Sequence, residues 1–243
     1  MIESRNLAEK KEILYALAPF SDGVKVFKRR ADLVDYTYSD LRLYGSKLSR
    51  GGVEGVLDGI TVAGVPVFEH RLCEAHRKLL SRFADKLDMG MDTDGLILNE
   101  FCTILAGASL PPYREGSPLL YHLDFVPGDD GRISQGLAEM FAQAHRLETD
   151  GDFCLKAAVI HTGIVRVYPY ADGFSELAAR AAMQYELIKA GYFPVDIGAG
   201  EQEYNSVTGA AIRTGEPSAF AALLRTAVFK KLHILIDAVE RGV

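Results

Sequence analysis

The feature that most constrains this chain is a pair of apolar helical segments joined by a short loop. Residues 157–167, AAVIHTGIVRV, are almost all apolar, and residues 177–192, LAARAAMQYELIKAGY, are rich in alanine. Helices that are apolar on every side are buried, so we expect both segments near the centre of the molecule. The loop between them, VYPYADGFSE at 167–176, therefore emerges at a fixed place. The start of the second helix offers free backbone N–H groups there, which suits an anion.

The rest of the chain is also dominated by helical periodicity, with one segment of different texture. That segment, LLYHLDFVPGDDGRI at 119–133, has partial apolar alternation around a Pro-Gly-Asp-Asp-Gly turn and predicts a β-hairpin. Loops are short and no repeat is present, so we expect a single, mainly helical (all-α) domain over 1–243 with one hairpin. The expected helices run from about Leu7 to Pro19, from about Leu33 to Gly51-Gly52, from Pro66 to about Phe83, and over about 94–106, 134–148, 152–166, 175–191, 203–213 and 218–241.

Composition and charge exclude several functional classes. The net charge is −6, from 27 Lys and Arg against 33 Asp and Glu, so no general affinity for nucleic acid is expected. No window approaches the roughly 18 apolar residues of a membrane span, and the N-terminal stretch has no apolar signal core, so we expect a cytoplasmic protein. Cys73, Cys102 and Cys154 lie far apart without zinc-binding spacing, which favours small core residues.

The loop and its flanking helices resemble the signature region of Fic (Fido-fold) proteins. The residues that carry the resemblance are IHTGIVRVYPYADG, a following Arg and MQYELIKAGYFPVDI, within 160–197; the family pattern is His-Pro-Phe-x-Asp/Glu-Gly-Asn-Gly-Arg-x-x-Arg. Three other segments agree. Pro112-Tyr113-Arg114 before the hairpin is similar to the family's Tyr-Arg and substrate-docking flap, residues 203–224 are similar to its last two helices, and SRGGVEG at 49–55 is similar to its Ser-x-x-x-Glu-Gly inhibitory helix.

The resemblance spans roughly residues 40–230 and implies a Fido fold with a β-hairpin flap, with N-terminal helices (1–60) before a Fic core (61–243). It also implies a reaction, in which the motif His takes a proton from a target hydroxyl that attacks the α-phosphate of ATP and receives AMP. The acidic residue binds Mg²⁺, the Gly-Asn-Gly segment and first Arg hold the phosphates, and the second Arg holds the γ-phosphate or pairs with the inhibitory Glu. Carried over by position, the catalytic residues are Tyr168 and Asp172 (also the metal ligand), and the phosphate-binding residues are Gly173, Phe174, Ser175, Glu176 and Arg180, with Arg114 as a further anion contact.

Several of these positions lack the side chain that the reaction needs. Tyr168 stands in place of the His, and a phenol with a pKa of about 10 is a poor base near neutrality. Phe174 replaces Asn and Ser175 replaces the second Gly, while Glu176 replaces the first Arg and reverses the charge where phosphates rest. Arg180 lies one residue later than the second Arg, about 100° further round a helix, unless the loop carries an insertion.

The same residues also fit a simple helix start. Ser175 suits an N-cap, Glu176 suits the first turn, and Glu176 and Arg180 have the spacing of an ion pair worth about 0.2–0.5 kcal/mol. Phe174 and Tyr170 then fill the emptied nucleotide pocket.

Two histidines are candidates for a replacement base. His161 lies mid-helix, about two turns from the loop, and is expected to be a core residue. His122 lies on the expected hairpin, where it either faces a substrate or is incidental.

The segment similar to the inhibitory helix keeps Glu54 and Gly55. Arg50 stands four residues before the Glu, and Gly51-Gly52 weakens a helix by about 1 kcal/mol per glycine relative to Ala. If Glu54 reaches Arg180, we expect a structural ion pair and no working switch.

These observations favour a pseudoenzyme that binds a protein or peptide at the 119–133 hairpin by main-chain pairing and needs no cofactor. The alternative is a protein nucleotidyltransferase of the AMPylation type, or a related phosphate-donor transferase, with non-standard residues. It requires Mg²⁺ with ATP or another donor, Asp172 as the metal ligand, and Arg114, Arg166 or Arg180 as the anion contact. A third hypothesis is a structural or toxin–antitoxin-like partner without a ligand. We expect no nucleic-acid or membrane partner; the oligomeric state stays open, with a homodimer as one option.

Overall fold

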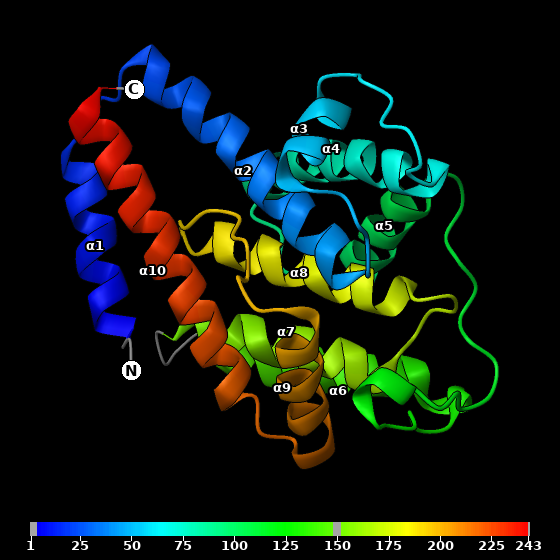
Figure 1. Ribbon diagram of the computed structural model, residues 1–243. Helices are drawn as coiled ribbons and strands as arrows, with labels where there is room; N and C mark the ends of the chain where they lie inside the picture. The colour runs from blue at the N-terminus through cyan, green and yellow to red at the C-terminus, as the bar shows by residue number, and fades with distance from the viewer. Residues whose placement is uncertain (1–3, 148–151, 243) are drawn as a thin grey trace.

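The computed structural model describes residues 4–147 and 152–242, and over this part of the chain its regular secondary structure is helical (Figure 1). The all-α expectation is therefore confirmed. Two short 3₁₀ helices, η1 (Tyr121–Leu123) and η2 (Asp130–Arg132), lie in the longest connection. The α-helices are α1 (Ser4–Ala16), α2 (Asp22–Leu43), α3 (Arg50–Leu57), α4 (Val67–Asp88), α5 (Gly95–Ala106), α6 (Ile133–Arg146), α7 (Phe153–Val167), α8 (Phe174–Lys189), α9 (Glu201–Thr214) and α10 (Ser218–Arg241).

Helices α7 and α8 form the centre of the molecule, as their composition predicts. α8 contributes to each of the three apolar clusters of the core, with Met183 in the first, Ala179 in the second and Tyr185 in the third. Its many alanines let the neighbouring helices approach closely without leaving voids. The loop from α7 to α8 therefore leaves the core at a place that packing fixes on every side.

The other helices surround this pair. α6 and α9 lie against α7, whereas α4 and α5 lie against α8. α1 runs beside α10, so the first and last helices of the chain are neighbours (Figure 1). Leu7 and Leu14 of α1 share one apolar cluster with Leu224 and Leu232 of α10. The N-terminal helices are thus packed into the same core as the rest of the chain.

The helix expected to end at Gly51-Gly52 is wrong in its boundaries. α2 starts at Asp22, capped by Ser21, and ends at Leu43, whereas Gly51 and Gly52 lie inside the separate helix α3. Two interactions offset the poor helix propensity of the glycines. The Ser49 hydroxyl caps α3 by accepting a hydrogen bond from the Gly52 N–H (3.1 Å), and Val53 is fully buried.

The β-hairpin expected over 119–133 is not confirmed. Within the described residues this segment forms one isolated antiparallel bridge, Leu120 to Phe125, which closes the 3₁₀ turn η1. Pro127 has no N–H for a strand ladder, and the Gly128 carbonyl accepts hydrogen bonds from the side chains of Arg114 and Ser117. The Gly128 carbonyl, which a second strand would need for pairing, is thus already bonded to side chains.

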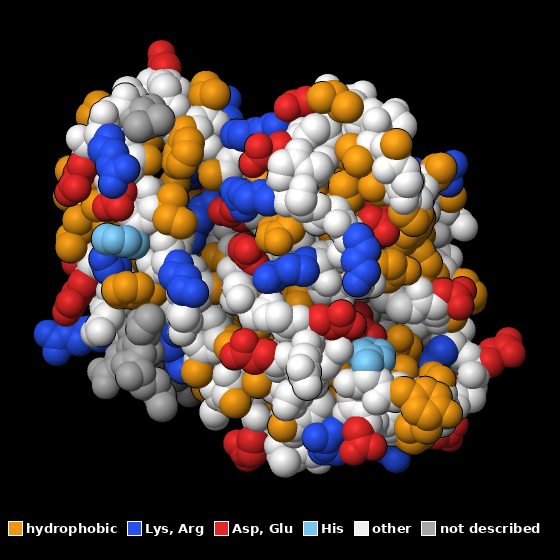
Figure 2. Space-filling model, in the orientation of Figure 1, with side chains coloured by type: hydrophobic (Ala, Val, Ile, Leu, Met, Phe, Trp, Pro, Cys, Tyr) orange, Lys and Arg blue, Asp and Glu red, His pale blue; other side chains and the backbone are white. Residues whose placement is uncertain are grey.

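The cysteines, the hydropathy of the helices and the surface charges can be compared with what the composition predicts. Cys73, Cys102 and Cys154 are buried and unpaired, and burial raises the pKa of each thiol, to about 12 for Cys102. Among the described helices, none combines the length and apolarity needed to cross a membrane. On the face drawn in Figure 2, Lys and Arg side chains alternate with Asp and Glu and form no extended basic area.

Candidate functional site

The loop between α7 and α8 reverses the chain through three residues with positive φ. Tyr168 ends α7 with φ 50°, and its N–H donates to the Ile164 carbonyl at 2.8 Å. Asp172 has φ 56°, and Gly173, with φ 79°, is the N-cap of α8. A left-handed backbone is costly for a residue with a side chain, so Tyr168 and Asp172 are held there by the packing of the two central helices.

Ser175 clamps this loop from inside helix α8. It is fully buried, and its hydroxyl accepts from the Tyr170 N–H (2.7 Å) and donates to the Tyr170 carbonyl (2.9 Å). The expectation that Ser175 is the N-cap is wrong, because the N-cap of α8 is Gly173 and the helix begins at Phe174. The Phe174 N–H donates to Ala171 and the Glu176 N–H to Gly173, so these two amides are already used within the loop.

Glu176 is the centre of a polar cluster that covers the start of α8. Its carboxylate lies 2.9 Å from Nε2 of His122, on the η1 turn, and 3.5 Å from the Tyr168 hydroxyl. The hydrogen bond to Glu176 raises the pKa of His122, although burial opposes it. Burial raises the pKa of Tyr168 well above its ordinary value, and the Glu176 charge adds to this shift. The expected pair of Glu176 with Arg180 is therefore wrong; Glu176 pairs with His122 instead.

Arg180 is buried, with 2 % of its surface exposed, and points to the N-terminal helices. Its Nε donates to Asp40 of α2, and the other Asp40 oxygen lies 2.8 Å from Nε2 of His76 on α4. Burial by itself raises the pKa of Asp40, but Arg180 and His76 reverse this and hold it below its usual range. Asp40 is therefore the charged partner that neutralises Arg180.

The sequence reasoning missed Asp40 and His76. The available signal was an acidic residue on an apolar helix face, since Asp40 follows Tyr36 by four residues and precedes Leu41, and all three are buried. A buried acid needs a cation, and only the tertiary structure shows that this cation is Arg180.

Arg114 holds the end of α7 and does not point a free guanidinium at the loop. Its Nε donates to the Tyr168 carbonyl (2.8 Å), and its Nη2 donates to the carbonyls of Gly128 (2.6 Å) and Val167 (3.2 Å). Its Nη1 donates to the Gly116 carbonyl. All three nitrogens are thus engaged by backbone oxygens, and the expected role of Arg114 as an anion contact has no support in this placement.

The remaining residues of the expected site make other contacts. Phe174 packs edge-on against Phe68 of α4, with ring centroids 6.5 Å apart. Tyr170 is fully buried. Glu54 lies on the half-exposed face of α3 beside Gly55 and pairs with Arg50 at 3.7 Å. Glu54 therefore does not reach Arg180, whose carboxylate partner is Asp40.

His161 is a core residue, as expected. Its Nε2 lies 2.7 Å from the Tyr204 hydroxyl, and its ring stacks on Phe220 with centroids 4.2 Å apart. Burial lowers the pKa of His161 to about 3, so the ring is neutral and serves packing.

The loop residues do not fit a magnesium-bound triphosphate as they stand. Asp172 is exposed at the tip and offers one carboxylate, but in residues 4–147 and 152–242 no three His, Cys, Asp or Glu side chains gather as a metal site. Glu176 places a negative charge in the first turn of α8, where phosphates would need a cation. Arg180, the cation carried over from the motif, is tied to Asp40.

A comparison with protein families assigns the chain. The model of the Fic/DOC family matches residues 66–187, about half of the sequence, from the start of α4 to the end of α8. This chain belongs to the Fic/DOC family. The match covers the loop and both central helices, so the Fic assignment rests on the segment that carries the candidate site.

Solved Fic structures have the same fold. A Fic domain containing signaling protein from Bacteroides thetaiotaomicron superposes with a TM-score of 0.80 at 16% identity, covering 98% of this chain and 97% of that one. Fic-1 from C. elegans gives 0.76 at 17% identity, covering 97% and 70%. A Fic family protein from Desulfovibrio desulfuricans gives 0.71 at 16% identity, covering 95% and 74%. No curated protein sequence matches the chain. Identities this low establish the Fic fold and leave the activity to the site residues.

Proposed function

We propose that this Fic protein acts by binding another protein and does not transfer a nucleotide at the 168–176 loop. The observation that carries the proposal is the position of Glu176. Its carboxylate lies in the first turn of α8, 2.9 Å from His122, so the anion that a helix start attracts is already supplied by the protein. A triphosphate in the same place would meet this charge at close range.

Two further features support the loss of the transfer reaction. The pKa of Tyr168 is raised by burial and by Glu176, so its hydroxyl stays protonated near neutral pH and cannot accept a proton. The guanidinium of Arg180 is neutralised by Asp40. The groups at the positions of the base and of the phosphate clamp are both committed to other partners.

The partner docks on the segment 119–126, beside this cluster. Leu119, Tyr121 and Val126 are 46 %, 85 % and 53 % exposed, which is unusual for large apolar side chains on one short turn. His122, on the same turn, ties the segment to Glu176 and so holds it over the loop. An apolar peptide segment of another protein fits these side chains, with Tyr121 as its central contact.

Calorimetry with ATP and Mg²⁺ tests the first half of the proposal. We expect no heat that depends on the loop, so wild type and Asp172→Ala give the same titration. Mass spectrometry of the protein and of added candidate targets is expected to show no added AMP. Micromolar ATP binding that Asp172→Ala abolishes would contradict the proposal.

Selection of a displayed peptide library tests the second half. Wild-type protein is expected to enrich peptides with apolar or aromatic anchors, and the double variant Leu119→Ser with Tyr121→Ser is expected to lose this enrichment. Ile234→Ser, which changes an exposed apolar residue on α10, is the matched control. Enrichment that survives in the double variant would remove 119–126 as the docking segment.

One observation favours the alternative, a protein nucleotidyltransferase or related phosphate-donor transferase with non-standard residues. The two terminal nitrogens of Arg180 are buried and have no hydrogen-bond partner within the described residues, although its Nε is bound to Asp40. Such donors suit an anion. Incubation with labelled nucleotides and other phosphate donors decides the matter: transfer of label that depends on both Asp172 and Arg180 would establish this function in place of the first.

A further inference from the structure

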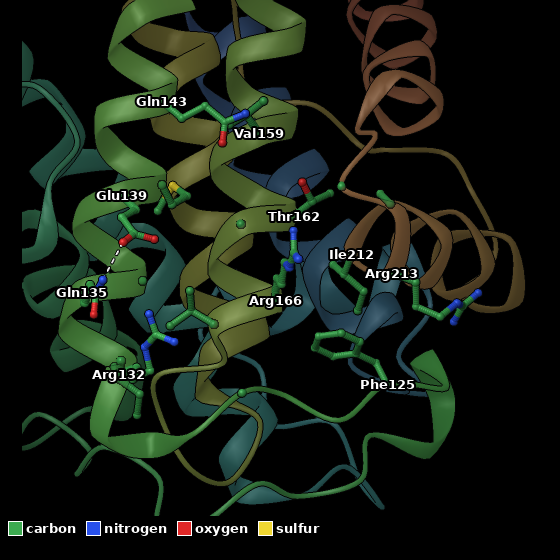
Figure 3. Close-up of a pocket in the computed structure, with 18 of the residues that line it drawn as sticks. Phe125, Arg132, Gln135, Glu139, Gln143, Val159, Thr162, Arg166, Ile212 and Arg213 are labelled. Carbon is green, nitrogen blue, oxygen red and sulfur yellow. Dashed lines mark hydrogen bonds between the residues drawn. The ribbon is translucent and has the colours of Figure 1, made fainter.

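A cavity lies outside the cluster around Glu176. It is a groove of about 840 Å³ between α6, α7 and the turn from α9 to α10, and the segment 125–129 closes one side (Figure 3). No residue of the 168–176 loop lines it. Sites for small molecules are clefts of roughly 300–1,000 Å³, so the groove has the size of a ligand site.

Two arginines whose side chains have no partner among the described residues line this groove. Most arginines of the described chain donate to a carboxylate or a carbonyl, but Arg132 and Arg166 have no such partner within residues 4–147 and 152–242. Arg132 comes from the start of α6, and Arg166 from the last turn of α7. The chain as a whole carries a net charge of −6, so two free cations facing one groove are a local excess of positive charge.

The position of Arg166 is set by its neighbours. In Figure 3 its side chain lies between Thr162, one turn earlier on α7, and Phe125. Gly215, the C-cap of α9, lies beside its Nη1, because a Cβ built on this glycine would be in ordinary van der Waals contact with that nitrogen at 3.6 Å. Arg166 therefore lies inside the groove, beside Gly215, and its donors have no partner in the described part of the chain.

The rest of the lining is mixed. Phe125 and Ile212 offer an apolar wall close to Arg166 (Figure 3), and Gln143 adds an amide without a partner among the described residues. Arg114 also lines the groove, but its donors are all used on carbonyls, so it adds no free hydrogen bond. A small molecule with an anionic head group and an apolar body could therefore contact both the arginines and the apolar wall.

We propose that this groove binds a small organic anion, a phosphate or carboxylate attached to an aromatic or aliphatic body. The anionic head lies between Arg132 and Arg166, where charge-assisted hydrogen bonds form. The body lies on Phe125 and Ile212. This site contains no residue of the 168–176 loop, but it shares Phe125 and Val126 with the proposed docking segment 119–126.

Acidic residues near the head limit the affinity. Glu139 of α6 lines the groove and accepts a hydrogen bond from Gln135 at 2.7 Å (Figure 3). Asp129 also lines it and accepts from the Gly131 N–H. Both carboxylates oppose the binding of an anion. Removal of one of these charges should therefore change affinity in the direction opposite to the loss of an arginine.

An NMR titration with phenyl phosphate tests the proposal. We expect amide shifts at Thr162, Gly163 and Gly215, on the groove walls, and no comparable shifts at 172–176. Arg166→Gln and Arg132→Gln are each expected to weaken binding about tenfold, the effect of one lost charge-assisted hydrogen bond. Glu139→Gln is expected to tighten binding a few-fold, because a like charge is removed.

Matched probes and controls make the outcome decisive. Arg29→Gln removes an exposed arginine of α2 that also lacks a partner in the described chain and should leave the affinity unchanged. Inorganic phosphate should bind more weakly than phenyl phosphate, phenol should not bind, and benzoate shows whether a carboxylate head suffices. Equal binding by wild type and Arg166→Gln, or an equal loss in Arg29→Gln, would overturn the site; equal affinity for inorganic phosphate would overturn the role of the apolar wall.

Nucleotides also combine an anionic phosphate with an aromatic body, so any nucleotide binding must be assigned either to the groove or to the 168–176 loop. The ATP titration is repeated with Arg166→Gln. Binding that Arg166→Gln abolishes and Asp172→Ala leaves intact belongs to the groove and supports this inference. Binding with the reverse dependence belongs to the loop, so it contradicts the proposed function and counts against the groove as the ATP site.

Discussion

Arg180 and Arg166 sit on adjacent helices and have the same chemistry, yet their surroundings are opposite. Arg180 is 2 % exposed and is held by Asp40, which His76 supports in turn. Arg166 is exposed, has no carboxylate partner in the described chain, and faces a groove. The difference teaches that a motif position does not fix the role of a cation. Burial and the nearest carboxylate decide whether it supports the fold or is free for a ligand.

The largest effect is expected from breaking the buried pair. Asp40→Asn leaves the Arg180 charge without its counter-ion, and the free energy of unfolding should fall by about 3–5 kcal/mol. Urea denaturation measures this loss. Asp58→Asn, which breaks a surface pair with Arg30, is the control and should cost less than about 1 kcal/mol. A similar small loss for both variants would show that Asp40 and Arg180 are not a structural pair.

A double variant sharpens this result. Asp40→Leu with Arg180→Met removes both charges together, so no unpaired charge remains in the core. Part of the stability lost in Asp40→Asn should return, because the Arg180 charge is no longer left without a counter-ion, whereas His76 still loses its hydrogen-bond partner. If the double variant is as unstable as Asp40→Asn, packing and not charge dominates this region.

The next effect concerns the clamp on the loop. Ser175→Ala removes a hydroxyl that both accepts from and donates to the Tyr170 backbone in a buried place. The unfolding free energy should fall by about 1–3 kcal/mol, since buried backbone groups lose their partner. Ser206→Ala, on an exposed position of α9, is the control and should not destabilise the protein. Thermal or urea unfolding of both variants distinguishes them.

A smaller effect is expected from pH at the cluster over the loop. The pKa of His122 is raised above its ordinary value of 6.5 by its hydrogen bond to Glu176. The contribution of the His122–Glu176 interaction to the free energy of unfolding is therefore fully present below about pH 6.5, and it is lost as the pH rises through the folded-state pKa of His122. Because His122 is partly exposed, it should amount to less than about 1 kcal/mol.

NMR titration of the His122 ring measures this directly. In Glu176→Gln the pKa of His122 should move down towards 6.5, whereas Glu54→Gln, a change on α3, should leave it unaltered. An unchanged pKa in Glu176→Gln would mean that His122 and Glu176 do not interact in solution.

The smallest effect on stability is expected in the groove. Arg166→Gln should change the free energy of unfolding by no more than about 0.5 kcal/mol, as for other surface changes without a partner. Its effect is expected on anion binding alone. A loss of several kcal/mol would erase the contrast with Arg180 and make Arg166 a structural residue.

Local pattern predicted most of the helices. The apolar period places α6, α7, α9 and α10 within a few residues of their observed bounds, because each has one long, uninterrupted stripe. The pattern failed where tertiary contacts replace local preference. Gly51 and Gly52 lie inside α3, because Val53 is buried. The 119–133 hairpin is absent from the described residues, because the Gly128 carbonyl accepts a hydrogen bond from Arg114 in place of a strand partner.

The sequence by itself determined the all-α class, the two buried central helices, the place of the loop, and the reversed charge at Glu176. The reason is that these properties depend on residue type and on spacing along one helix. Only the tertiary structure decided the partners of the charges: His122 for Glu176, Asp40 for Arg180, and none in the described chain for Arg166. The partners of Glu176 and Arg180 lie 54 and 140 positions away along the chain, so no local sequence pattern can predict them.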